Sequence, residues 1–216
     1  MKYKSVFYCL ITSLIIVACK ESVVSFEETQ PTDCKALQVF PSKILGSYYN
    51  PDENSELEIA KEFIIKKLMI NDTLNMREID ENETIDYDTL YNSKTKEKYQ
   101  IRRINDSLFS NYVLYDTIFI INKDHVLKKL KGHFFLNKRI NKSDFWAVEK
   151  LSYSNEILNI NRIETEEEMK LLQSITETKM DSTKPFSVKP TKKQFKEFLK
   201  KNGFVNGDTY LKKEIK

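Results

Sequence analysis

The sequence predicts a mostly β (α+β) fold: an antiparallel β-meander with two short helices toward the C-terminus. Between residues 44 and 163, apolar and polar side chains mainly alternate, which is typical of strands with one buried face. β-Branched and aromatic residues fill these runs, and Asn, Asp and Ser separate them as turn residues do. Turns recur about every 8–12 residues, a spacing that indicates consecutive hairpins.

The first predicted strand, at 44–49, contains Gly46-Ser47-Tyr48. This triplet resembles the Gly-x-Trp sequence that opens lipocalin-type barrels, so an open barrel or a lipocalin-like barrel is the expected form of the meander. The later strands are expected at 99–104, 108–115, 118–121, 126–130, 134–136, 145–153 and 157–163, with short edge strands at 186–188 and 210–211.

The segment 57–70 fits two interpretations. Ser55 followed by Glu58 has the pattern of a helical capping box, but apolar positions alternate from Leu57 onward. We interpret the segment as strands because it continues into the turn-like pair Asn71-Asp72.

Two later segments carry helix-start signals. Thr165 followed by Glu168 is a capping box and predicts a helix over 165–176. Thr191 followed by Gln194 predicts a second helix over 191–201, with Gly203 as its C′ stop. Each helix has an apolar stripe: Met169, Leu172 and Ile175 in the first, and Phe195, Phe198 and Leu199 in the second.

The N-terminus combines a basic start with an apolar run. Lys2 and Lys4 precede residues 6–18, which are almost all apolar and too few for a comfortable membrane span. The run ends in Ala18-Cys19, which resembles the lipobox of bacterial lipoproteins. That resemblance implies cleavage before Cys19 and lipidation of its thiol and amino group. The alternatives are an uncleaved N-terminal helix or an ordinary secretory signal.

The lipoprotein resemblance sets the expected domain organisation. Residues 1–18 would be the signal peptide, 19–40 the lipidated cysteine with a flexible tether, and 41–216 a single β-rich domain. The protein would be attached by lipid to a membrane of the bacterial cell envelope, with the outer membrane as the expected location.

Enzyme signatures are missing from the sequence. There is no Gly-x-Ser-x-Gly elbow, no glycine-rich phosphate loop and no His-Glu-x-x-His, and the chain has only 4 glycines. His125 and His133 are separated by a predicted strand, and Cys34 has no nearby base. We therefore expect no catalytic residue, no metal ligand and no cofactor.

Charge is distributed unevenly along the chain. Residues 52–97 carry thirteen acids against six basic side chains, whereas residues 184–216 carry ten lysines against three acids. Residues 123–142 hold seven Lys or Arg and one acid, with Phe134 and Phe135 among them. Such a stretch can bind an anionic glycan or lipid, or it can simply be a solvated strand surface. Nucleic acid is not an expected partner of an anchored envelope protein.

A recurrent Asp-[Ser/Thr] pattern resembles the O-glycosylation sequon of some exported bacterial proteins. The alternative is that Asp-Thr simply occupies turns before strands. The acceptor hydroxyls would be Thr73, Thr89, Ser107, Thr117 and Ser182.

Two functional hypotheses follow. The first is a lipid-anchored envelope protein whose β-rich domain binds a ligand or a protein partner without catalysis. The second is a membrane-anchored envelope hydrolase that acts on glycan or peptide, because two suitably spaced carboxylates would suffice and carboxylates are numerous.

Overall fold

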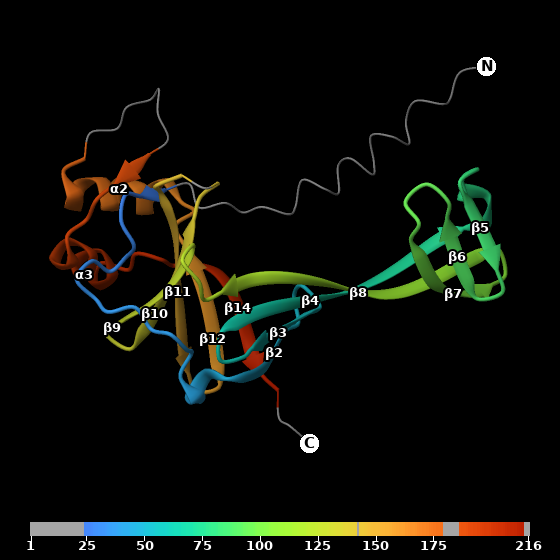
Figure 1. The fold of residues 1–216 in the computed structure, drawn as a ribbon, viewed down its shortest axis with the longest axis horizontal. Helices are drawn as coiled ribbons and strands as arrows, with labels where there is room; N and C mark the ends of the chain where they lie inside the picture. The colour runs from blue at the N-terminus through green and yellow to red at the C-terminus, as the bar shows by residue number, and fades with distance from the viewer. Residues whose placement is uncertain (1–23, 142, 179–185, 214–216) are drawn as a thin grey trace, which may run out of the picture. The chain divides into compact units, whose positions relative to one another are not determined.

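The computed structural model describes residues 24–141, 143–178 and 186–213 (Figure 1). Strands account for 51% and helices for 14% of the structure, which confirms the predicted mostly-β fold with two helices near the C-terminus. The sheet is dominated by antiparallel pairs and is not closed. Of the two expected forms, the closed lipocalin-like barrel is therefore not the one observed.

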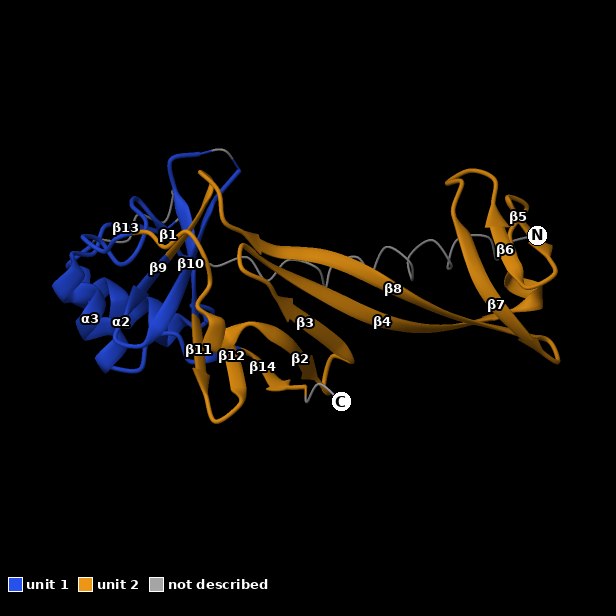
Figure 2. Ribbon diagram, turned by 60° about the horizontal axis from the view of Figure 1, so that its bottom comes forward, with its two compact units in different colours: residues 1–35, 128–150, 161–207 blue, residues 36–127, 151–160, 208–216 orange. Residues whose placement is uncertain are grey.

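The chain divides into two compact units (Figure 2). Unit 1 holds residues up to 35 together with 128–150 and 161–207, and unit 2 holds 36–127, 151–160 and 208–216. The single domain expected over 41–216 stays a prediction. Four of the five crossings between the units, at 127–128, 150–151, 160–161 and 207–208, fall inside strands, and the fifth, at 35–36, lies outside them. No linker therefore marks most of the boundary in the sequence.

Unit 2 contains most of the meander. After the 3-10 turn η2 (Ser42–Ile44), the strands β2 (Gly46–Asn50), β3 (Ser55–Ile59) and β4 (Phe63–Asn75) are antiparallel neighbours. The interpretation of 57–70 as strands is therefore confirmed. The other elements that lie wholly in this unit are η3 (Met76–Glu78), β5 (Glu83–Asp86), β6 (Thr89–Asn92), β7 (Lys98–Ile104) and β8 (Ser107–Ile120).

The strands β4 and β8 form a long antiparallel pair. They are paired from Phe63 opposite Ile120 to Asn75 opposite Ser107, with one shift of register between Ile64 and Ile65. β5, β6 and β7 continue the meander from the far end of this pair, where Leu90, Ile101 and Leu108 form a small buried cluster of their own. β5 and β6 were not among the individually predicted strands.

The predicted break between strands at Asp116-Thr117 is wrong. Both residues lie inside β8, where Asp116 is opposite Lys66 and Thr117 is opposite Ile65 of β4. An opposite-charge pair across two strands stabilises the pairing. The partner strand therefore overrides the local turn preference of the Asp-Thr sequence.

Unit 1 combines sheet with the two helices. Its own elements are β1 (Ser25–Phe26), β10 (His133–Arg139), α2 (Glu166–Thr176), β13 (Ser187–Val188) and α3 (Lys192–Lys200). Parts of four further strands belong to it: β9 (His125–Leu130), β11 (Trp146–Ser154), β12 (Ile157–Arg162) and β14 (Asn206–Lys212). β14 is longer than the predicted strand at 210–211.

Both helices begin as predicted. The Thr165 side chain accepts a hydrogen bond from the Glu168 N–H, and the Thr191 side chain accepts one from the Gln194 N–H. In return, the Glu168 side chain accepts from the Thr165 N–H and the Gln194 side chain accepts from the Thr191 N–H, which completes both capping boxes. The inner face of α3 buries Phe195 and Phe198, which join Phe26, Phe135 and Phe204 in an aromatic core. The apolar stripe of α3 thus packs its helix onto the sheet of unit 1.

Gly203 differs from its predicted role. The first residue with left-handed backbone after α3 is Asn202, with a φ of 62°, and Gly203 does not have positive φ. A Cβ atom at Gly203 would lie only 2.4 Å from the ring of Phe198. Gly203 is therefore required because the chain passes directly over a buried ring, a constraint that comes from packing.

The predicted tether over 19–40 is wrong for its described part. β1 pairs with β11 and with β13, and Val24 and Phe26 are fully buried. Further along, the Gln30 N–H donates to the side chain of Asn137, which donates back to the Gln30 carbonyl. In unit 2, Phe40 is buried against Phe119. The segment is polar because it makes specific hydrogen bonds within the fold.

The Glu168 carboxylate is buried and ties the start of α2 to the segment after α3. One oxygen accepts from the N–H of Glu164 and Thr165, and the other accepts from the Val205 N–H at 2.9 Å. Burial works to raise the pKa of Glu168, but these bonds and the Thr165 hydroxyl outweigh it and hold the pKa below its ordinary value.

Glu168→Gln is expected to lower the free energy of unfolding by about 1–3 kcal/mol, because the amide nitrogen would face backbone donors. The pKa of Glu168 is lower in the folded state than its unfolded value of about 4.3, so the charged carboxylate stabilises the fold at pH values above that unfolded pKa. This stabilisation is lost as the pH falls through the folded-state pKa. The difference from wild type should therefore be constant near neutral pH and shrink in acid. Urea unfolding at several pH values measures this difference in the free energy of unfolding.

The control is Glu166→Gln, which changes an exposed glutamate in the same helical turn. It should lower the free energy of unfolding by less than about 1 kcal/mol. Equal losses in the two variants would contradict the role of Glu168.

Candidate functional site

The residues considered for metal binding or nucleophilic chemistry are divided between the two units. His125 belongs to unit 2 and stacks on Phe119 with ring centroids 5.3 Å apart. His133 belongs to unit 1, where burial and then the Lys150 charge lower its pKa. Cys34 is a half-buried free thiol in unit 1. Within the described ranges, no three His, Cys, Asp or Glu side chains are grouped so as to hold a metal ion.

The candidate glycosylation sites fall into two structural settings. Thr73 and Thr117 are exposed within β4 and β8, whereas Thr89 and Ser107 are the first residues of β6 and β8. The second pair matches the alternative of a turn before a strand. Ser182 and Cys19 lie outside the described residues, and modification at all of these positions stays a prediction.

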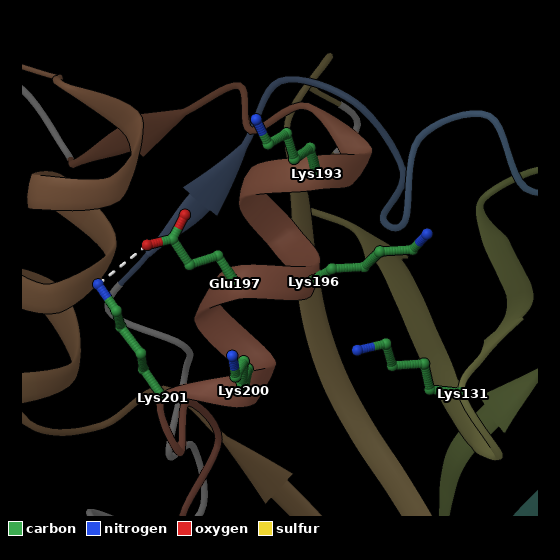
Figure 3. A pocket seen from close by; sticks show the side chains of 6 residues that line it. All are labelled: Lys131, Lys193, Lys196, Glu197, Lys200 and Lys201. Atoms are coloured by element: carbon green, nitrogen blue, oxygen red, sulfur yellow. Dashed lines mark ion pairs between the residues drawn. The ribbon is translucent and has the colours of Figure 1, made fainter.

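A basic surface depression is present in unit 1. It has a volume of about 400 Å³ and is lined by five lysines and one glutamate: Lys131, Lys193, Lys196, Glu197, Lys200 and Lys201. Figure 3 shows Lys131 and Lys196 on one side of α3 and Glu197 with Lys201 on the other. We refer to these six residues as the basic site.

Helical periodicity places most of the basic site on the outer face of α3. Lys196 follows Lys193 by three residues, and Lys200 follows Lys196 by four. This spacing keeps side chains on one side of a helix. Phe195 and Phe198 occupy the opposite, buried face. The same amphipathic pattern that packs α3 onto the sheet therefore gathers these lysines in solvent.

Lys131 reaches the basic site from a tight turn. It is followed by Gly132 between β9 and β10, and both residues have positive φ, of 48° and 85°. Such a two-residue turn matches the twist of a hairpin, and glycine adopts its conformation without strain. The turn thus brings one lysine of the basic stretch 123–142 to the lysines of α3.

The basic site is strongly positive. Glu197 pairs with Lys201 at 2.9 Å, and this hydrogen bond, followed by the Lys201 charge, lowers the pKa of Glu197. Lys193 and Lys200 add to the effect. Among the described residues, Lys131, Lys193, Lys196 and Lys200 have no ion-pair partner. Four ammonium groups are therefore available to an anion.

No family model matched the chain, and neither did any curated protein or solved structure. In the described part of the chain, no helix is long and apolar enough to cross a membrane. The functional assignment therefore depends on the sequence motif at the N-terminus and on the geometry of the basic site.

Proposed function

We propose that this protein is a lipid-anchored bacterial envelope protein whose folded part binds an anionic polymer, a glycan or a lipid surface, without catalysis. The observation that carries the binding proposal is the convergence of five lysines from two separate stretches of sequence on the basic site. The anchor is inferred from the lipobox-like residues 1–19.

The short link between anchor and fold supports this proposal. Only residues 20–23 separate Cys19 from the first described residue, Val24. The five extended steps from Cys19 to Val24 span at most about 18 Å. A lipidated Cys19 would thus hold the folded part near the membrane surface, where anionic head groups and envelope glycans are concentrated.

The chemistry of the basic site favours binding over the alternative of an envelope hydrolase. Hydrolysis of a glycosidic bond requires two carboxyl groups that flank the scissile bond. The basic site offers a single carboxylate, Glu197, which is already paired with Lys201. Several ammonium groups on one open surface instead suit an extended ligand with repeated negative charges.

A triple variant tests the basic site. Each lysine near an anionic surface contributes about 1 kcal/mol, so Lys193→Ala, Lys196→Ala and Lys200→Ala together should weaken binding on the order of 100-fold. The three side chains are at the outer face of α3, so the fold should be retained. Binding is measured by fluorescence anisotropy with labelled heparin and labelled polyphosphate, using full-length protein in a non-ionic detergent.

The matched control removes three exposed lysines from unit 2: Lys61→Ala, Lys94→Ala and Lys123→Ala. It has the same net charge as the test variant, so it should bind nearly as well as wild type. Equal losses in both variants would indicate attraction by overall charge and would contradict a localised site. Binding of heparin alone would favour a glycan ligand, and binding of polyphosphate alone would favour phosphate groups such as those of lipids.

A further inference from the structure

The middle of the β4–β8 pair has an open edge (Figure 2). On its outer side, β8 pairs with β7 only as far as Ser110. At the other end, a bulge opposite Ile64 and Ile65 interrupts the register after Thr117. The regular part of β8 without a second neighbour among the described strands is therefore 111–117, and its midpoint is Leu114.

This open edge has few of the features that normally prevent strand association, since the bulge lies just beyond Thr117. Edge strands are usually protected by lysine, proline or a bulge. Residues 111–117 contain neither lysine nor proline, and Asp116 is their one charged side chain. Val113, Leu114 and Tyr115 are 44%, 49% and 70% exposed although they are apolar or aromatic.

A two-stranded pair is also an incomplete sheet. Two strands alone are marginally stable in water, and three or more are needed for independent stability. Between Met69 and Asn75, β4 likewise pairs only with β8 among the described strands. An added strand along β8 would thus complete the sheet where it is thinnest.

We infer that residues 111–117 of β8 pair antiparallel with the same residues of a second copy of this chain, around a two-fold axis at Leu114. The proposal follows from the self-complementarity of the segment. In this register Leu114 lies opposite itself, and Val113 lies opposite Tyr115. Pairs of aromatic and β-branched residues across strands are stabilising.

The charges and backbone groups agree with this register. Asp116 lies opposite Tyr112, whose hydroxyl can donate to the carboxylate, so the two Asp116 side chains do not face each other. In a strand, the backbone N–H and C=O groups of every second residue point to the same side. In this register even-numbered residues lie opposite even-numbered residues, and odd-numbered opposite odd-numbered. The backbone groups of β8 that point away from β4 in one copy therefore face the corresponding groups in the other copy. The result is a closed dimer with a four-stranded centre.

Point variants at the axis test the dimer. Full-length protein in a non-ionic detergent is expected to sediment as a dimer at micromolar concentration. Leu114→Lys places two like charges opposite each other and should raise the dissociation constant at least tenfold. Val39→Lys also replaces an apolar side chain by lysine, at a residue of similar exposure (47% against 49%) outside β8, and should leave the dimer intact.

Cysteine cross-linking tests the register. In a Cys34→Ser background, Leu114→Cys should form a cross-linked dimer on mild oxidation, because directly opposite Cβ atoms lie about 4.5–5.5 Å apart. Asp116→Cys should not, because the two copies of residue 116 are offset by four residues, about 13 Å. Cys34→Ser alone is the background. A monomeric wild type would overturn the proposal, even if the edge bound an added peptide, and so would equal cross-linking at both positions.

Discussion

Phe195→Ala is expected to lower the free energy of unfolding by about 3–5 kcal/mol, the usual cost of truncating a buried phenylalanine. Phe195 is fully buried, and its ring lies 5.1 Å from that of Phe135, 6.0 Å from Phe204 and 6.4 Å from Phe26. These rings come from β10, from the segment after α3 and from β1. Removing Phe195 therefore leaves a cavity where three parts of unit 1 meet.

The single tryptophan makes this effect measurable. Trp146 lies in β11 of unit 1, opposite Phe26 of β1, so its fluorescence during urea unfolding reports on the affected unit. Phe145→Ala is the matched control, because Phe145 is 39% exposed in the same unit and should cost less than about 1 kcal/mol. If Phe195→Ala does not fold, Phe195→Leu leaves a smaller cavity and should still cost more than the control. A cost for Phe195→Ala no larger than that for Phe145→Ala would contradict the central position of Phe195.

Local signals in the sequence predicted the elements well where those signals are strong. The Thr165 and Thr191 capping boxes identified both helices because a capping box satisfies backbone donors within four residues. Alternation and the β-branched and aromatic residues identified the strands between 98 and 139. Their burial does not simply alternate, because Val113, Leu114 and Tyr115 of β8 are all exposed whereas residues 134–137 of β10 are all buried. The mostly-β fold class follows from these short-range patterns.

The structural features that the sequence patterns did not predict depend on contacts between residues that are far apart in the chain. Asp116-Thr117 continues β8 because β4 lies beside it, and the segment from Val24 to Gln30 is ordered by partners more than a hundred residues away. Gly203 depends on the ring of Phe198, which no sequence pattern reveals.

The basic site was predicted only in its parts. The sequence predicts a possible anion-binding surface in the stretch 123–142, whereas residues 184–216 show only an excess of lysines. What the sequence could not give is that the turn at Lys131 lies beside α3, because that depends on packing of the helix against the sheet. The spacing of Lys193, Lys196 and Lys200 was a readable signal for a lysine-rich helix face within 191–201.

Cys19→Ala is expected to abolish lipid attachment. The prediction rests on the order of features in residues 1–19: two lysines, an apolar run shorter than a comfortable span, a small residue at position 18, and the cysteine. Each buried CH₂ contributes about 0.8 kcal/mol, so two or more acyl chains would hold the protein on the membrane stably. Removing the thiol removes the acceptor for the diacylglyceryl group and leaves the apolar run unchanged.

The measurement is fatty-acid labelling in a bacterial host, combined with the mass of the N-terminal fragment. Wild type should carry label, begin at Cys19 and stay with membranes after high-salt washing, because salt screens charges without affecting buried acyl chains. Cys19→Ala should carry no label and retain residues 1–18, whereas Cys9→Ala and Cys34→Ala should label like wild type. An unlabelled wild type that begins at another residue would eliminate the lipoprotein hypothesis. Because the basic site does not include Cys19, its binding to heparin or polyphosphate would still be tested independently.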